Sequence, residues 1–123
     1  MQRPNVPGID VREADRRVRA EPSTILLDVR ESDEFAMLRA PGAVLVPLSE
    51  FAARFEELPR DHSLLVVCAV GGRSAMATEF LLRQGYSQAV NVEGGMTAWR
   101  AAGLATHSGV PAPGEGELPQ ARS

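Results

Sequence analysis

An apolar run that leads directly into the only cysteine of the chain constrains the fold more than any other feature. Residues 64–67 are four branched apolar residues bounded by polar ones, a pattern typical of a strand buried on both faces of a sheet. A short loop with two glycines follows Cys68, and residues 75–84 favour a helix. Cys68 is therefore predicted at a strand-to-helix crossover, the edge where open α/β sheets bind ligands.

Apolar runs and helix-forming segments alternate along the rest of the chain. Strands are predicted near residue 9 and over 23–30, 43–46, 64–67 and 88–92, and helices over 11–20, 32–38, 50–58, 75–84 and 96–102. Strands that alternate with helices over short connections predict an α/β fold, with a central, mainly parallel five-stranded sheet flanked by helices.

Length and charge limit the classes of function. The chain has 123 residues, enough for one domain with a real core, and a net charge of −3 with both signs scattered. This distribution offers no extended basic surface, so we expect no nucleic-acid and no membrane partner. The longest apolar runs are far shorter than the roughly 20 residues of a membrane span, which favours a cytoplasmic protein.

The ends of the chain differ in composition from its middle. We predict a flexible N-terminal arm over residues 1–8, a single domain over 9–107, and a disordered Pro/Gly-rich tail over 108–123. One cysteine cannot form an internal disulfide, so any chemistry at Cys68 must be completed by another molecule.

The residues after Cys68 could stabilise a negative charge on its sulfur. A thiol becomes a nucleophile only as thiolate, and backbone N–H groups of a tight loop at a helix N-terminus can stabilise that charge. Gly71 and Gly72 permit such a turn, and Arg73 adds a positive charge at its end. The alternative is that Cys68 is a small buried core residue. A glycine pair followed by an arginine serves packing poorly, which favours a functional cysteine.

A second pair of polar residues ends the strand predicted over 23–30. Asp28 and Arg30 lie at its carboxyl end and are expected to face the crossover at Cys68, where they would support the site. The alternative is a local surface ion pair, which would contribute little to stability.

Five segments in the same order resemble the signatures of the single-domain rhodanese-like (sulfurtransferase) family, and the resemblance extends over about residues 9–104. The segments are residues 10–27, which would form the first helix and the second strand, Leu27-Asp28-Val29-Arg30-Glu31 with Glu34-Phe35, Ala40-Pro41-Gly42-Ala43 with Pro47, Cys68-Ala69-Val70-Gly71-Gly72-Arg73-Ser74, and Glu93-Gly94-Gly95-Met96 with Trp99 and Gly103-Leu104. The order of five motifs is far more specific than any one of them.

The resemblance implies a three-layer fold and a persulfide mechanism. Cys68 would be the catalytic nucleophile that takes the outer sulfur of thiosulfate or of a persulfide donor, and a thiol, cyanide or a protein acceptor would remove it. The persulfide would be held by the loop, and Asp28 and Arg30 would support it. The residues of that loop are Ala69, Val70, Gly71, Gly72, Arg73 and Ser74. No cofactor and no metal is implied.

Two departures from the family pattern bear on the substrate. Leu38, Arg39 and Ala40 stand where the family commonly has Gly-His-Ile. Ala69 and Val70 follow the cysteine, where thiosulfate-active members often carry a cationic side chain. We therefore predict weak affinity for thiosulfate, and a persulfide or thiol-borne sulfur as the better donor.

Two other functions remain open at this point. One is a non-catalytic sulfur-carrier or partner-binding module, which the missing cationic residue favours. The other is a cysteine-dependent phosphatase or arsenate reductase, since such enzymes also hold a thiolate in an arginine-ended loop. Those with this loop architecture generally have five residues between cysteine and arginine, whereas four separate Cys68 from Arg73.

Overall fold

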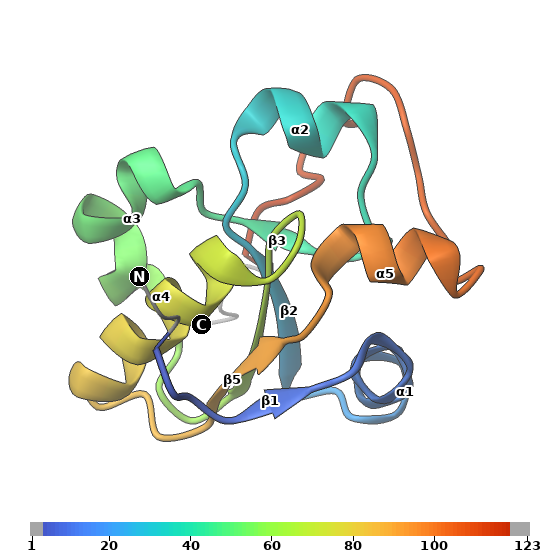
Figure 1. The fold of residues 1–123 in the computed structure, drawn as a ribbon. Coiled ribbons are helices and arrows are strands. Elements are labelled where there is room, and N and C mark those ends of the chain that lie inside the picture. The colour runs from blue at the N-terminus through green and yellow to red at the C-terminus, as the bar shows by residue number, and fades with distance from the viewer. Residues whose placement is uncertain (1–3, 119–123) are drawn as a thin grey trace.

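Five strands form one parallel sheet at the centre of the computed structural model, which describes residues 4–118 (Figure 1). The strands are β1 (Gly8–Ile9), β2 (Thr24–Asp28), β3 (Val44–Leu45), β4 (Ser63–Val67) and β5 (Ala89–Val92), in the order β1-β5-β4-β2-β3. The helices are α1 (Val11–Ala20), α2 (Ser32–Met37), α3 (Leu48–Arg54), the 3-10 turn η1 (Phe55–Glu57), α4 (Gly72–Arg83) and α5 (Gly95–Ala101). The predicted α/β fold with a parallel five-stranded sheet is confirmed.

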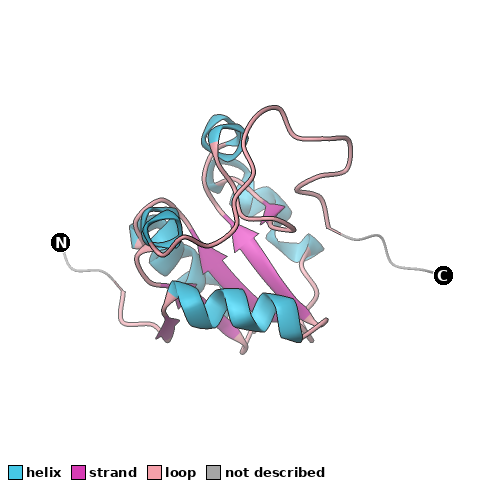
Figure 2. Cartoon of the chain, turned by 90° about the vertical axis from the view of Figure 1, so that its right-hand side faces the viewer, coloured by secondary structure: helices cyan, strands magenta, loops and turns pink. Residues whose placement is uncertain are grey.

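The strand that ends at the cysteine lies in the middle of this sheet. β4 pairs in parallel with β2 on one side and with β5 on the other. Because successive side chains of a strand alternate between faces, Leu64 and Val66 pack in the core beneath α3 and α4, and Leu65 and Val67 in the core beneath α1 and α5. Helices thus cover both faces of the sheet (Figures 1 and 2), which explains the continuous apolar run.

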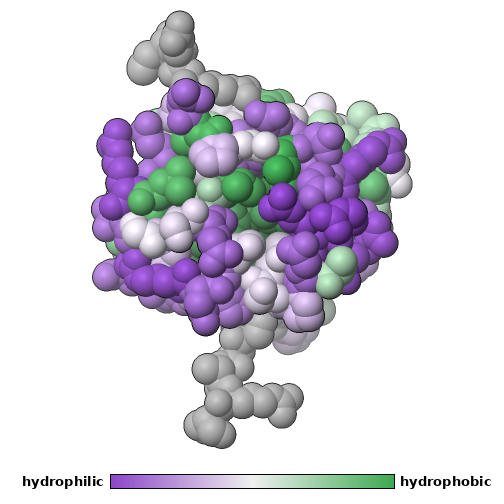
Figure 3. Space-filling model, turned by 90° about the horizontal axis from the view of Figure 1, so that it is seen from below, coloured by the Kyte–Doolittle hydropathy of each residue, from purple (hydrophilic) through white to green (hydrophobic). Residues whose placement is uncertain are grey.

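Hydrophobic side chains and a cavity mark the end of the sheet where the strands begin (Figure 3). Seen from below, hydrophobic side chains remain visible in the middle of the molecule, with hydrophilic ones around them (Figure 3). A cavity of about 490 Å³ lies at the amino ends of the strands, with Thr24, His62 and Leu118 in its wall. Within residues 4–118, no helix is long and apolar enough to cross a membrane.

The N-terminal arm is shorter than predicted. Gly8 belongs to β1 and pairs with Asn91 of β5, and the carbonyl of Pro7 accepts a hydrogen bond from Asn91 N at 2.8 Å. The edge of β5 offers unpaired backbone groups that this short extended segment satisfies. Residues 1–3 of the predicted arm lie outside the described residues.

The C-terminal segment differs from the prediction of a disordered tail. Residues 108–118 run beside α2 and the edge strand β3, where Leu45 N donates to Gly116 O at 2.7 Å. Through this bond the C-terminal segment satisfies a backbone group at the edge of the sheet, although the segment carries few apolar side chains. Residues 119–123 of the predicted tail lie outside the described residues.

A buried arginine fixes this segment. Arg39 is 4 % exposed, and its guanidinium donates to Gly109 O at 2.8 Å and to the Glu115 carboxylate at 3.1 Å. A buried guanidinium must have its donors satisfied, and the acceptors are the carbonyls of Phe35 and Ala36 together with groups of residues beyond 107. Composition alone could not show this, because two well-placed acceptors suffice to dock the segment.

Candidate active site

The Cys68 side chain lies inside the turn that joins β4 to α4. The residue is 1 % exposed, and Sγ accepts a hydrogen bond from Gly71 N at 3.1 Å. The hydroxyl of Ser74 is 3.3 Å from the same sulfur. The prediction that Cys68 sits at a strand-to-helix crossover, with donors of the following residues aimed at it, is confirmed.

One glycine makes the turn possible. Gly71 has φ +105°, in the left-handed region that favours glycine, whereas Gly72 already has helical geometry. The helix therefore begins at Gly72, three residues earlier than the prediction of 75–84. Arg73 and Ser74, predicted in the loop, lie in the first turn of α4, so the sulfur faces the amino end of a twelve-residue helix.

Two opposing effects set the charge state of the sulfur. Burial raises the pKa of Cys68, and it is the largest single effect. Hydrogen bonds from the Ser74 hydroxyl and from the N–H groups of Ser74, Gly71 and Val70 act in the other direction. Together they hold the pKa of Cys68 below its ordinary value, which favours the nucleophilic thiolate.

A buried asparagine on the neighbouring strand completes the sulfur environment. Ser74 Oγ is 2.6 Å from Asn91 Oδ1, and Asn91 Nδ2 donates to Gly71 O at 3.4 Å. The Ser74 hydroxyl has one hydrogen, so it can donate to Asn91 or to the sulfur. When Cys68 is a thiol, S–H can donate to Ser74, which donates to Asn91. When Cys68 is a thiolate, the hydroxyl hydrogen turns to the sulfur.

Sequence reasoning did not assign a role to Asn91. The residue is 4 % exposed and pairs with Val66 in the register between β4 and β5, which brings it next to the turn. The only signal in the sequence is one amide side chain in an otherwise apolar strand. Such a residue needs partners when buried, but the sequence does not say which.

Arg73 bridges the turn to α2. Its two terminal nitrogens each donate to one carboxylate oxygen of Glu34 at 2.8 Å. The hydrogen bonds from Arg73 lower the pKa of Glu34 to about 2, and the carboxylate in turn raises the pKa of Arg73. The positive charge expected to serve the sulfur anion is therefore shared with a carboxylate that no sequence spacing had linked to it.

Asp28 and Arg30 form a buried pair rather than a surface one. Asp28 is fully buried and Arg30 is 5 % exposed, and Arg30 Nη2 donates to Asp28 Oδ2 and to Leu38 O, both at 2.7 Å. The pair thus fastens the end of α2 to the carboxyl end of β2. Among residues 4–118, no group of three or more His, Cys, Asp or Glu side chains could hold a metal ion.

The amino end of α5 packs against the loop that follows Cys68. Met96 N donates to Cys68 O at 2.8 Å, and Thr97 N donates to Ala69 O at 3.0 Å. Gly95 has φ +58°, and a Cβ there would lie about 2.5 Å from Ala69 O. The segment Glu93-Gly94-Gly95, interpreted from sequence as a turn, is therefore where the first turn of α5 closes onto the cysteine loop.

Comparison with known proteins agrees with this geometry. Residues 10–102 match the family model of the rhodanese-like domain, and the chain belongs to this family. A sulfurtransferase of Allochromatium vinosum is 32% identical over 99 residues, which cover 80% of this chain and 92% of that protein. A rhodanese-related protein of Thermoplasma volcanium has the same fold, with a TM-score of 0.76, 32% identity, and coverage of 82% of this chain and 97% of that one.

A third relative suggests a different use of the same domain. YrkF of Bacillus subtilis, whose name describes a candidate sulfur carrier protein, is 34% identical over 95 residues. The matched region covers 77% of this chain but only 51% of YrkF, so the chain spans about half the length of that relative. The family therefore includes relatives named for sulfur transfer and for sulfur carriage.

Proposed function

We propose that this chain is a sulfurtransferase that moves a sulfane sulfur from thiosulfate or a persulfide donor to a thiol or cyanide through a Cys68 persulfide. The observation that carries the proposal is the environment of Cys68 Sγ. A buried sulfur with the Gly71 N–H at 3.1 Å and the Ser74 hydroxyl at 3.3 Å suits an anion. The membership of the rhodanese-like family supports sulfur as the atom transferred.

The reaction consists of two displacements at sulfur. The Cys68 thiolate attacks the outer sulfur of the donor, a new S–S bond forms, and the donor leaves with the electron pair of the broken bond, as sulfite when the donor is thiosulfate. An acceptor thiolate or cyanide then attacks the outer sulfur of Cys68–S–S⁻. The S–S bond to Cys68 breaks, and its electron pair restores the thiolate.

The loop residues have separate roles in this proposal. The N–H groups from Ala69 to Ser74 hold the persulfide anion, with Gly71 supplying the turn that points them inward. Arg73 fixes the loop through Glu34. Asp28 and Arg30 act on the site indirectly, because they hold the end of α2 against the sheet.

The side chains around the loop favour a persulfide donor over thiosulfate. Ala69 and Val70 provide no cationic side chain beside Cys68, and Val70 is 56 % exposed. The nearest positive charge in the loop, on Arg73, already has Glu34 as its partner. The loop itself therefore offers a free dianion such as thiosulfate no unpaired cationic side chain for charge-assisted hydrogen bonds. The short loop of four residues between Cys68 and Arg73 also favours one sulfur atom over a phosphate.

A turnover assay separates the enzyme from a sulfur carrier, the second candidate that YrkF suggests. Purified protein is supplied with thiosulfate or with a small-molecule persulfide as donor, and with cyanide or a thiol as acceptor. The product, thiocyanate or the persulfide of the acceptor thiol, is counted per protein molecule, with Cys68→Ser as the control. An enzyme gives many turnovers, and the persulfide is the more efficient donor. A single turnover without further release assigns the chain to sulfur carriage, and equal product from Cys68→Ser contradicts both.

A further inference from the structure

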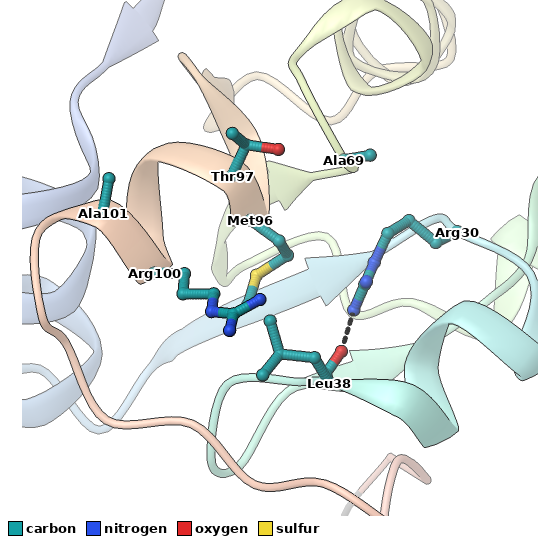
Figure 4. A pocket seen from close by; sticks show the side chains of 7 residues that line it. All are labelled: Arg30, Leu38, Ala69, Met96, Thr97, Arg100 and Ala101. Carbon is teal, nitrogen blue, oxygen red and sulfur yellow. Dashed lines mark hydrogen bonds between the residues drawn. The ribbon is translucent and has the colours of Figure 1, made fainter.

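A cleft of about 470 Å³ opens beside the cysteine loop, between α5 and the end of α2. Its wall contains Ala69 of the loop, and this wall is continuous with α5 because Thr97 N donates to Ala69 O. Leu38 and Met96 make the middle of the cleft apolar (Figure 4). This volume is that of a small-molecule site, and its place next to the loop suits a reactant that must reach Cys68.

Two guanidinium groups reach this cleft from opposite walls. Arg30 comes from the loop after β2. Arg100 comes from α5, and its side chain extends past Met96 into the cleft (Figure 4). The charge of Arg30 is balanced by Asp28 at 2.7 Å. Arg100 is exposed and forms no ion pair with any of residues 4–118.

The lining of the cleft therefore has a net positive charge. None of the residues in its wall is acidic, and the hydroxyl of Thr97 adds a neutral polar group. The residues of the wall are Arg30, Leu38, Ala69, Met96, Thr97, Arg100 and Ala101. A planar guanidinium at the rim of an apolar cleft matches a carboxylate, which it can bind with two parallel hydrogen bonds.

We propose that this cleft binds the acceptor of the sulfur as a small thiol that carries a carboxylate, with Arg100 as the residue that selects it. The inference rests on the proposed sulfur transfer. The carboxylate pairs with Arg100, the short aliphatic part lies on Met96 and Leu38, and the thiolate end points over Ala69 toward the loop. The thiolate then attacks the outer sulfur of Cys68–S–S⁻, the bond to Cys68 breaks, and the Cys68 thiolate leaves with the electron pair.

The test compares two thiols of equal length, 3-mercaptopropionate and 3-mercapto-1-propanol, which differ in the carboxylate. Binding to the resting protein is measured first by NMR titration of the backbone amides, so this step needs no sulfur on Cys68. The rate at which each thiol removes sulfur from persulfide-loaded protein is measured second. The variants are Arg100→Gln and Arg100→Lys, with Arg83→Gln as the matched control, since Arg83 is an exposed arginine in the last turn of α4, away from the cleft.

The native protein is expected to bind and to react with 3-mercaptopropionate roughly fivefold better than with the alcohol. The shifted amides are those of Met96, Thr97 and Ala69. Arg100→Gln removes the preference, Arg100→Lys keeps part of it, and Arg83→Gln keeps all of it. High salt reduces the preference, because the carboxylate meets an exposed charge.

The inference is overturned if the native protein does not distinguish the two thiols, or if Arg100→Gln distinguishes them as the native protein does. Failure of Cys68 to accept sulfur from any donor contradicts the proposed function instead. In that event the NMR titration still decides whether the cleft binds the carboxylate.

Discussion

Replacement of Ser74 by alanine tests how the sulfur is held as an anion. Ser74→Ala removes the hydroxyl that lies 3.3 Å from Cys68 Sγ and leaves the N–H donors of the turn in place. Because this hydroxyl lowers the pKa of Cys68, its loss raises that pKa toward its ordinary value. A smaller fraction of Cys68 is then thiolate at neutral pH.

The size of the effect follows from the hydrogen bond that is lost. A hydrogen bond to a charged group contributes about 1.5–3 kcal/mol, and the Ser74 hydroxyl is shared with Asn91 Oδ1 at 2.6 Å, which favours the lower end. A contribution of about 1.4 kcal/mol corresponds to a tenfold change in an equilibrium constant, so the thiolate fraction at neutral pH falls roughly tenfold. The variant also leaves Asn91 Oδ1 without its donor, which costs about 1–3 kcal/mol of folding stability.

The assay is the rate of Cys68 alkylation by iodoacetamide as a function of pH. The matched control is Thr78→Val, which removes the hydrogen bond from Thr78 Oγ1 to Ser74 O, 2.7 Å long, without touching the sulfur. We expect Ser74→Ala to react roughly tenfold more slowly at neutral pH and to approach the native rate at high pH, where both sulfurs are ionised. A native pH profile for Ser74→Ala, or an equal shift in Thr78→Val, would refute the assignment of this hydroxyl.

Three further predictions concern the surroundings of the turn. Asp28→Asn leaves the buried Arg30 charge uncompensated and should lower the free energy of unfolding in urea by about 3–5 kcal/mol; a change near zero contradicts the buried pair. Glu34 has a pKa of about 2 against an ordinary 4.5, so its ion pair stabilises the fold fully above pH 4.5 and this contribution is lost as the pH falls toward 2. Arg73→Gln should make the acid-unfolding curve less steep over this range, and an unchanged curve counts against the ion pair between Glu34 and Arg73. Gly95→Ala places a Cβ against the cysteine loop at φ +58°, so both the melting temperature and the rate of sulfur loading should fall, and native values for both would contradict the close packing.

The sheet and the position of the cysteine could be predicted because they depend on local patterns. The apolar run at 64–67 requires burial on both faces, and this requirement alone places β4 in the interior of a parallel sheet. The first turn of α4 was missed because Gly71 at φ +105° turns the chain so sharply that the helix can start at the next residue. A sequence shows that a glycine permits this conformation, but not that the chain adopts it.

The contacts of the site with distant segments could not be predicted. Asn91 reaches Ser74 only through the register of β5 on β4, and Glu34 reaches Arg73 only through the placement of α2 above the turn. The same holds for Arg39, which has two acceptors some 70 residues further along the chain in addition to carbonyls of α2. In each case the tertiary structure determines which residue is the hydrogen-bond partner. The sequence shows only that a polar residue, if buried, needs a partner.

The mass of the intact protein shows whether Cys68 carries the transferred sulfur. After incubation with a small-molecule persulfide and removal of the excess reagent, the native chain should gain the mass of one sulfur atom, located on Cys68 by fragmentation. The gain should disappear when a thiol acceptor is added and should be absent from Cys68→Ser. A native protein that never gains this mass, or a Cys68→Ser protein that gains it equally, contradicts the role of Cys68 as the residue that carries the sulfur.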